Sequence, residues 1–233
     1  MDMTALTFAI GDVHGCFDKL DGLMRRCTEY AGTRSFRFVM LGDYIDRGPD
    51  SRLVIDRLRR LCEQRPNAMV CLMGNHEDLL LAAVENPAEI GNWIDNGGDT
   101  TLESYGVDGP ANLPDHDIEW IRHLPLYFDD GVRFFVHAGI DPAVPLDQQD
   151  RETMLWTRKR YSETASPGRF IVHGHTPVRS GQPEQHPHRL NLDTGAVYGG
   201  PLSAAVFTPD RTSPVALLVG SKTICVGDAS KPV

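Results

Sequence analysis

The sequence predicts an α/β protein (α+β in its broader class) that folds as a four-layered sandwich, with two packed sheets flanked by helices. Two observations favour this fold class. Short apolar runs stop at glycine or histidine, which is typical of buried strands that each deliver a loop, and helical patterns follow the earliest of them. The C-terminal part instead alternates short apolar runs with Gly, Pro and Asp, which is typical of a strand meander.

Each element follows from a local pattern. The strands that deliver a loop are expected at 8–10, 36–41, 69–73, 133–136 and 169–172. Helical spacing of apolar residues predicts two helices, one through Phe17, Leu20, Met24 and Cys27 and one through Leu53, Leu58 and Leu61. The meander strands are expected at 189–192, 203–208, 215–219 and 223–226. We expect the alternating units to form the first sheet and the meander to form the second.

Residues 87–127 interrupt the alternation. They contain Trp93, an Asn96-Gly97-Gly98 turn and the prolines Pro110, Pro114 and Pro125. This composition predicts a mostly helical insertion near the site. The whole chain of 233 residues fits one domain, 1–233, that carries this insertion.

Composition narrows the function classes. The net charge of −9 repels a phosphate backbone, so we expect no stable nucleic-acid binding, although a local basic pocket could hold one phosphate. Five cysteines without a CxxC pair indicate reduced thiols and a cytoplasmic protein. The sequence has neither a signal peptide nor an apolar run of about 18 residues, so no membrane association is expected.

Polar residues follow the ends of five predicted strands. The loops are Gly11-Asp12-Val13-His14-Gly15, Gly42-Asp43-Tyr44-Ile45-Asp46-Arg47-Gly48, Gly74-Asn75-His76-Glu77, His137-Ala138-Gly139 and Gly174-His175-Thr176. Strand ends in an α/β sheet point into one crevice, where such folds bind substrates. Taken singly, such residues are usually loop and cap residues, but together they form the carboxylate, imidazole and amide set that binds manganese, iron or zinc.

The spacing suggests two metal ions. Asp12 and His14 lie on one turn and can hold one ion together, and the two oxygens of Asp43 can bridge to a second. Asn75, His137 and His175 would complete the second site. Two adjacent metals clamp the oxygens of an in-line displacement, which suits phosphoester hydrolysis.

These five segments resemble the ordered motif set of the phosphoprotein phosphatase family of binuclear metallophosphatases, from about Asp12 to Tyr198. The sequence is most similar to the bacterial and lambda phage phosphatase-like branch, because Trp156-Thr157-Arg158 resembles its Trp-x-Arg. The resemblance implies an αββα calcineurin-like metallophosphatase sandwich of two mixed sheets. It also implies two divalent metal ions, manganese first and iron or zinc as alternatives.

The resemblance implies a role for each matching residue. Asp12, His14 and Asp43 would bind the first metal, and Asp43, Asn75, His137 and His175 the second. His76 would protonate the leaving group, with Asp46 as its carboxylate partner. Arg47, Arg158 and Asn75 would contact the phosphoryl group. The reaction expected is direct attack by a metal-bound hydroxide on phosphoserine or phosphothreonine, with phosphotyrosine a further substrate.

Alternatives remain for the function and for four residues. Dinucleoside polyphosphate hydrolysis uses the same motif set and shares His137-Ala138-Gly139-Ile140, but the chain is short for that group, and its Asn75 and Thr176 motifs resemble protein phosphatases. A third hypothesis is an inactive metal-binding scaffold. The sequence leaves open the oligomeric state and whether 87–127 forms a lid. It also leaves open the roles of Cys16, His173 and Tyr198, and whether Arg158, in the run Arg158-Lys159-Arg160, is merely an exposed helix residue.

Overall fold

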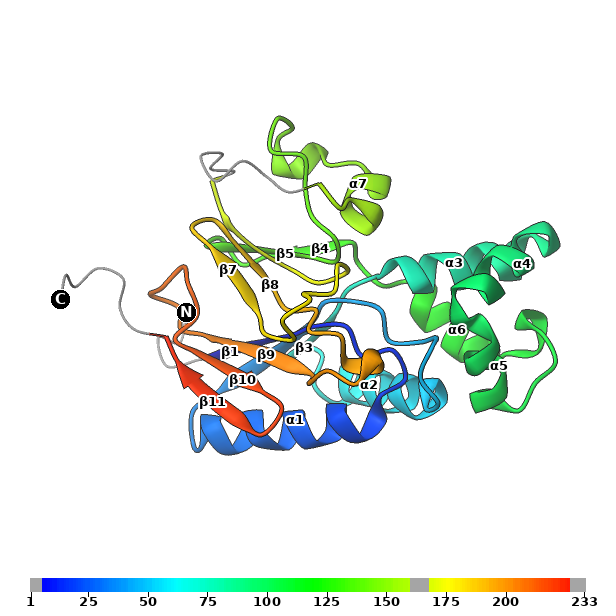
Figure 1. Ribbon diagram of the computed structural model, residues 1–233, viewed down its shortest axis with the longest axis horizontal. Helices are drawn as coiled ribbons and strands as arrows, with labels where there is room; N and C mark the ends of the chain where they lie inside the picture. The colour runs from blue at the N-terminus through cyan, green and yellow to red at the C-terminus, as the bar shows by residue number, and fades with distance from the viewer. Residues whose placement is uncertain (1–5, 160–167, 227–233) are drawn as a thin grey trace.

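The computed structural model describes residues 6–159 and 168–226, and these form two mixed β-sheets with helices outside them (Figure 1). The first sheet has the strand order β11-β10-β9-β1-β2-β3. Its strands are β1 (Leu6–Ile10), β2 (Phe36–Met40), β3 (Met69–Cys71), β9 (Ser203–Phe207), β10 (Ala216–Val219) and β11 (Lys222–Cys225). β1, β2 and β3 run parallel, and β9 pairs antiparallel with β1.

The second sheet has the order β4-β5-β6-β8-β7. Its strands are β4 (Tyr127–Asp129), β5 (Arg133–Val136), β6 (Phe170–His173), β7 (Glu184–His186) and β8 (Arg189–Asn191). The central strands β5, β6 and β8 run parallel, and β4 and β7 flank them antiparallel. The two-sheet architecture predicted from the sequence is confirmed.

The predicted division of strands between the sheets is wrong. The strands β9, β10 and β11 extend the first sheet, because β9 pairs with β1 through a register that includes Phe8 and Val206. The second sheet is built from 127–191 instead. Only β8 of the predicted meander lies there, and it pairs parallel with β6.

The helices lie in two outer layers and at one end. α1 (Phe17–Ala31) and α2 (Ser51–Gln64) cover the outer face of the first sheet, and α7 (Arg151–Trp156) lies on the second sheet (Figure 1). The remaining helices gather at one end of the sandwich (Figure 1). They are α3 (Asn75–Glu85), α4 (Ile90–Trp93), α5 (Asp99–Tyr105) and α6 (Asp115–Arg122), with the short helical turns 87–89, 94–98 and 110–112; two further turns lie at 146–148 and 196–198.

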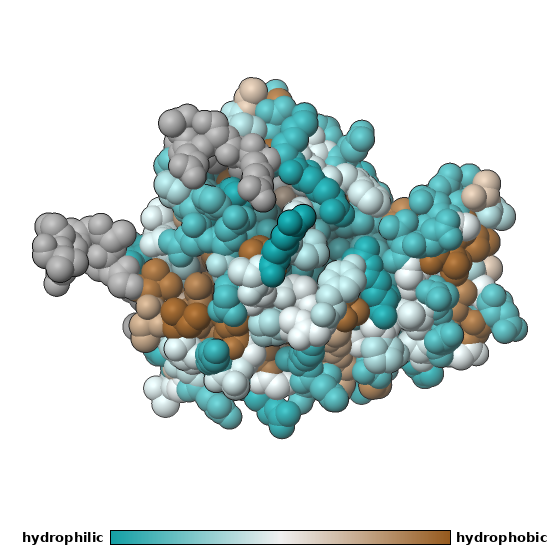
Figure 2. All heavy atoms as spheres, in the orientation of Figure 1, coloured by the Kyte–Doolittle hydropathy of each residue, from teal (hydrophilic) through white to brown (hydrophobic). Residues whose placement is uncertain are grey.

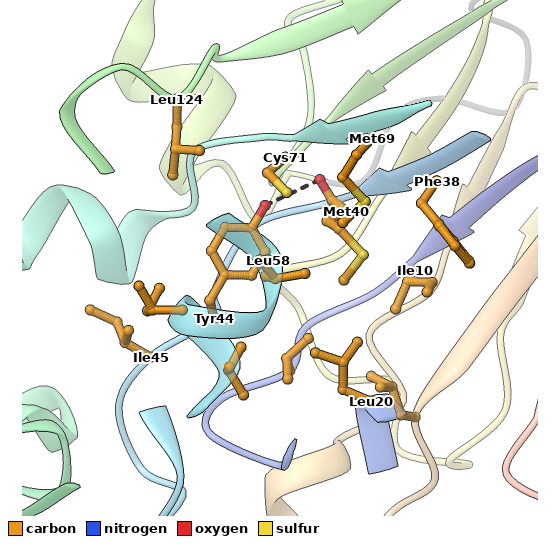
Figure 3. Close-up of a cluster of buried hydrophobic side chains, with 14 of the residues drawn as sticks. Ile10, Leu20, Phe38, Met40, Tyr44, Ile45, Leu58, Met69, Cys71 and Leu124 are labelled. Atoms are coloured by element: carbon orange, nitrogen blue, oxygen red, sulfur yellow. Dashed lines mark hydrogen bonds between the residues drawn. The ribbon is translucent and has the colours of Figure 1, made fainter. Parts of the chain in front are cut away.

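Separate apolar clusters hold the layers together. Between the sheets, Val39 and Leu72 of the first sheet side pack with Phe135 and Val172 of the second. A larger cluster joins the first sheet to its helices, and Figure 3 shows Leu58 of α2 over Met40 and Cys71. Burial of such side chains stabilises the fold by about 1.5–3 kcal/mol each.

Candidate metal centre

The structure brings the predicted ligand residues to one place. Each follows a strand: Asp12 and His14 follow β1, Asp43 follows β2, Asn75 follows β3, His137 follows β5 and His175 follows β6. All six are buried, with at most 5% of each residue exposed. The parallel strands of both sheets therefore deliver their polar ends to a common edge, as the sequence predicts.

Unusual backbone conformations concentrate at this edge. Among the described residues, five that are not glycine have a positive φ, and all belong to the predicted site: His14, Asp43, Asp46, Arg47 and His175. Such conformations cost about 1–3 kcal/mol each and persist only where the surroundings impose them. These strained conformations lower the stability of the fold, and they direct the side chains into the site.

Glycines permit the close approach of the site loops. A Cβ on Gly174 would collide with the Asp12 carboxylate, and one on Gly74 would collide with the Asp43 backbone N and carboxylate. The glycines in these motifs are thus required by space beside the carboxylates.

Two histidines direct their Nε2 atoms toward carboxylate oxygens. His14 donates its Nδ1–H to the carbonyl of Ile45 at 2.8 Å, and His137 donates its Nδ1–H to the carbonyl of Leu41 at 2.8 Å. Their Nε2 lone pairs then face Asp43, whose oxygens lie 3.4 Å from His14 and 3.3 Å from His137. Burial lowers the pKa of His14 to about 3 and also lowers the pKa of His137, so a metal ion suits these facing acceptors better than a proton does.

The second part of the site has the same character. Asn75 Oδ1 lies 2.9 Å from His137 Nε2 and 2.8 Å from His175 Nδ1. His175 Nε2 is buried without a hydrogen-bond partner among the described residues. Burial lowers the pKa of His175 to about 3, so its imidazole is neutral and one ring nitrogen carries a lone pair that can bind a metal.

Two groups of ligand atoms share Asp43. His14, Asp43 and His76 offer atoms within 4.8 Å of one another, and so do Asp43, His137 and His175. Imidazole nitrogen with carboxylate oxygen suits a divalent transition metal. The residues present therefore fit two metal ions bridged by Asp43. Asp12 lies outside both groups and accepts the backbone N–H of His175 at 3.0 and 3.1 Å.

A further buried carboxylate lies at the site and was not predicted. Asp193 is 4% exposed, and burial raises its pKa to about 6. Burial, followed by the charges of Asp193 and Asp43, raises the pKa of Asp12 as well. A cation nearby would stabilise the charged form of carboxylates crowded away from water. Asp193 could have been predicted from the sequence, because it follows the strand β8 as Asp12 follows β1.

His76 and Asp46 form a hydrogen-bonded pair. His76 Nδ1 lies 2.7 Å from Asp46 Oδ2, and both residues are buried. Trp93 donates its indole N–H to both Asp46 oxygens at 3.0 and 3.1 Å, and Thr101 donates its hydroxyl to Oδ1 at 2.7 Å. Burial lowers the pKa of His76, but the carboxylates of Asp43 and Asp46 outweigh it, so its pKa is raised.

Trp93 and Thr101 were not predicted as site residues. They lie 47 and 55 residues from Asp46 along the chain, and no local pattern pairs them with it. The helices α4 and α5 thus orient the carboxylate of Asp46. That segment supports the site from one end of the sandwich.

Glu77 and Tyr44 fix the loop that carries Asp43. The Glu77 carboxylate accepts the backbone N–H groups of Asp43, Tyr44, Ile45 and Gly74 at 2.8–3.4 Å. The Tyr44 hydroxyl donates to the carbonyls of Leu72 at 2.7 Å and Met40 at 3.3 Å, the latter dashed in Figure 3. Asp43 therefore lies between two anchors to the core.

The two predicted arginines lie on different sides of the centre. Arg47 donates its Nη1–H to His14 Nε2 at 2.9 Å, and its guanidinium lies 5.9 Å from the ring centre of Tyr198. Arg158 follows α7 and is exposed. It lies outside any helix, and Arg160 lies outside the described residues. Burial is the main cause of the lowered pKa of His137 and of His175, and the positive charge of Arg158 also lowers both pKa values. Arg158 therefore acts electrostatically on the centre.

Two residues left open by the sequence lie beside the site. His173 is buried, its Nδ1–H donates to the carbonyl of Gly174 at 3.1 Å, and its Nε2 lies 3.4 Å from Arg189 Nη1. Cys16 is half-buried at the start of α1, and burial raises the pKa of its thiol. Among the described helices, none has the length and apolar character needed to cross a membrane.

Comparison with known proteins places the chain in one family. The family model described as "Calcineurin-like phosphoesterase" matches residues 7–206. A symmetrical bis(5'-nucleosyl)-tetraphosphatase of Dechloromonas aromatica is 32% identical over 72% of this chain, which spans only 51% of that relative. An asymmetrical tetraphosphatase, PrpE, of Oceanobacillus iheyensis is 29% identical over 85% of this chain and 87% of its own. Serine/threonine-protein phosphatase 1 of Salmonella typhimurium is 31% identical over 85% and 90%.

Solved structures share the fold at lower identity. A protein named provisionally as a diadenosine tetraphosphatase has a TM-score of 0.69 and 24% identity, with 94% of this chain and 95% of that chain covered. A cold-active protein-tyrosine phosphatase of a psychrophilic Shewanella has a TM-score of 0.67 and 18% identity, with 92% and 77% covered.

Proposed function

We propose, from the premise that this chain belongs to the calcineurin-like phosphoesterase family, that it hydrolyses dinucleoside polyphosphates such as diadenosine tetraphosphate. The sequence favoured a phosphoprotein substrate, partly because the chain is short for a dinucleotide enzyme. That argument is wrong, since the PrpE relative matches it over 87% of its own length. Tetraphosphatases also predominate among the relatives described above.

One observation of the site carries this proposal. Two exposed aromatic side chains flank the metal centre: Tyr198, 64% exposed, beside Arg47, and Trp156, 37% exposed, with its ring 6.3 Å from that of His175. Nucleobases stack on such rings with about 1–3 kcal/mol per base. A phosphorylated serine or threonine has no ring to occupy them.

Each role within the reaction rests on this chain's own groups. Asp12, His14, Asp43, Asn75, His137 and His175 would hold two divalent ions, manganese first, with Asp193 close to Asp12. Bound ions supply Lewis-acid charge to a phosphoryl group. Arg47 and Arg158 bind phosphoryl oxygens by charge-assisted hydrogen bonds, as Asn75 does through its amide. His76 holds a proton at Nε2 for the leaving oxygen, and Asp46 fixes its tautomer.

The second candidate function is a serine/threonine phosphatase. It is supported by 31% identity to the Salmonella phosphatase over most of both chains. It uses the same site, and it keeps the predicted phosphoprotein or phosphopeptide substrates. The cytoplasmic location stays a prediction in either case.

The test compares both substrates on one preparation. We expect kcat/KM with manganese to be higher for diadenosine tetraphosphate than for a phosphothreonine peptide. Preference for the peptide would instead support the second candidate. Lack of turnover of both substrates and of p-nitrophenyl phosphate would indicate an inactive metal-binding scaffold.

A further inference from the structure

A cavity of about 480 Å³ lies beside the metal centre. Its wall includes Ala138 and Thr176, which directly follow His137 and His175 in the sequence. The cavity therefore adjoins these two candidate ligands. The volume lies within the range of about 300–1,000 Å³ that is typical of small-molecule sites. Among the described residues of its wall, only Arg158 has a role in the predicted reaction.

The cavity is strongly cationic. Four of the described residues in its wall are basic: Arg158, Lys159, Arg179 and Arg189. Glu184 is the only carboxylate among the described lining residues. The chain as a whole carries a net charge of −9, so this concentration of positive charge runs against the average surface. Such a cavity selects anions.

The structure holds one of these cations in place. Arg189 is 9% exposed, its Nη2 lies 3.7 Å from Glu184 Oε2, and its Nη1 lies 3.4 Å from His173 Nε2. Because His173 donates its Nδ1–H to the carbonyl of Gly174, its Nε2 is free to accept from Arg189. This arrangement gives the buried histidine next to the site a role in positioning a guanidinium.

Other cations remain available to a ligand. Arg158 and Arg179 are exposed, and neither forms an ion pair with a carboxylate in the described part of the chain. The surface between α7 and the middle of the molecule is mostly hydrophilic (Figure 2). Guanidinium groups bind phosphate oxygens in a forked geometry, so several along one cavity suit several linked phosphates.

We infer that this cavity binds the phosphate chain of a nucleoside polyphosphate, beyond the phosphate that lies at the metal centre. The inference rests on the proposed function and names the part of the substrate that sets specificity. A phosphomonoester of a protein places a single phosphate at the metals, where Arg158 can contact it, and leaves Arg179 without an anion. Arg179 is the most direct probe of the cavity because its side chain is exposed. Of the predicted ligands, only His175 is close to it in the sequence.

The first experiment measures specificity in Arg179→Gln. The ratio of kcat/KM for diadenosine tetraphosphate to kcat/KM for p-nitrophenyl phosphate should fall about tenfold or more, mostly through KM, because a charge-assisted hydrogen bond is lost. The matched control is Arg60→Gln, an exposed arginine on α2 outside the cavity, which should keep the wild-type ratio. An unchanged ratio in Arg179→Gln would overturn the inference.

The second experiment separates this inference from the proposed function. Calorimetric titration of the manganese-loaded full chain with tripolyphosphate, at matched free manganese, should give a Kd at least about tenfold weaker for Arg179→Gln than for Arg60→Gln. Equal values would overturn the cavity's role even if the dinucleotide is hydrolysed. A tenfold loss in an enzyme that prefers the phosphopeptide would refute the proposed function and keep the cavity as a site for linked phosphates.

Discussion

His76 is placed where it can act either as an acid or as a metal ligand. Its Nδ1 is occupied by Asp46 at 2.7 Å, and its Nε2 is the atom left for the centre. It lies with His14 and Asp43 in one group of potential ligand atoms, where the sequence analysis had expected Asp12. Whether His76 is an acid or a metal ligand can therefore be tested by substituting this residue.

The substitution His76→Asn should slow turnover and leave the metals in place. Loss of a general acid costs about 10² to 10⁴ in kcat. Metal content, measured by mass spectrometry after dialysis, should stay equal to that of the wild type. Loss of one ion per chain would show that His76 is a ligand, and Asp12 would then be the residue to reassign.

The substitution Asp46→Asn should shift the pH dependence of kcat. The protonated form of His76 is the active acid, so activity falls as the pH rises through its pKa. That pKa is raised, since the carboxylates of Asp43 and Asp46 outweigh burial. Without the Asp46 charge the pKa drops, and the alkaline limb should move to lower pH by about 1 unit or more.

The control for this shift is Asp95→Asn, which removes an exposed carboxylate from the same helical end of the molecule. It should leave the profile in place. An alkaline limb that stays fixed in Asp46→Asn would mean that a group other than His76 gives up the proton.

At the scale of elements, sequence patterns predicted the buried strands and the exposed edge strand β11, and missed β4 and β7. β1, β2 and β5 were predicted because continuous apolar runs end at a glycine or histidine. β4 and β7 were missed because they are edge strands with exposed residues and no apolar alternation. The third strand is followed by a helix, α3, whose first residues Asn75 and His76 were predicted as loop.

Glu77 connects α3 to the loop after β2, and its substitution tests that connection. Burial raises its pKa to about 8, yet both carboxylate oxygens accept backbone N–H groups, and we take these four donors to favour the carboxylate. In Glu77→Gln an amide NH₂ would face some of these donors. We expect the free energy of unfolding to fall by about 1–3 kcal/mol in urea denaturation.

The comparison for this prediction is Glu103→Gln, an exposed glutamate on α5 that should leave the free energy of unfolding unchanged. Manganese affinity should weaken only in Glu77→Gln, because only there does the loop that carries Asp43 lose its anchor. Unchanged stability in both variants would mean that Glu77 is protonated in the folded protein.

At the scale of the whole molecule, local sequence patterns could not predict which distant segments lie in the same layer. The pairing of β9 with β1 joins residues about 200 apart, and the contact of Trp93 with Asp46 is also non-local. Strand ends could be predicted, because each motif is local to its strand. The motif set therefore predicted the candidate metal ligands, whereas the support of Asp46 and the cationic cavity required the structure.

The metal centre also links binding to global stability. Its candidate ligands come from both sheets, so an ion held by them would join the two halves of the sandwich and would bind only the folded chain. At a concentration near 100 times Kd such binding stabilises by about 2.7 kcal/mol, which for a chain of this size raises Tm by about 5–10 °C. Thermal unfolding in manganese and in chelator should show this difference in Tm, and Asp95→Asn should keep it.

Asp43→Asn should abolish most of this difference in Tm, because Asp43 is shared by both groups of ligands. A variant that kept two ions per chain and the full rise in Tm would show that Asp43 does not bridge the metals.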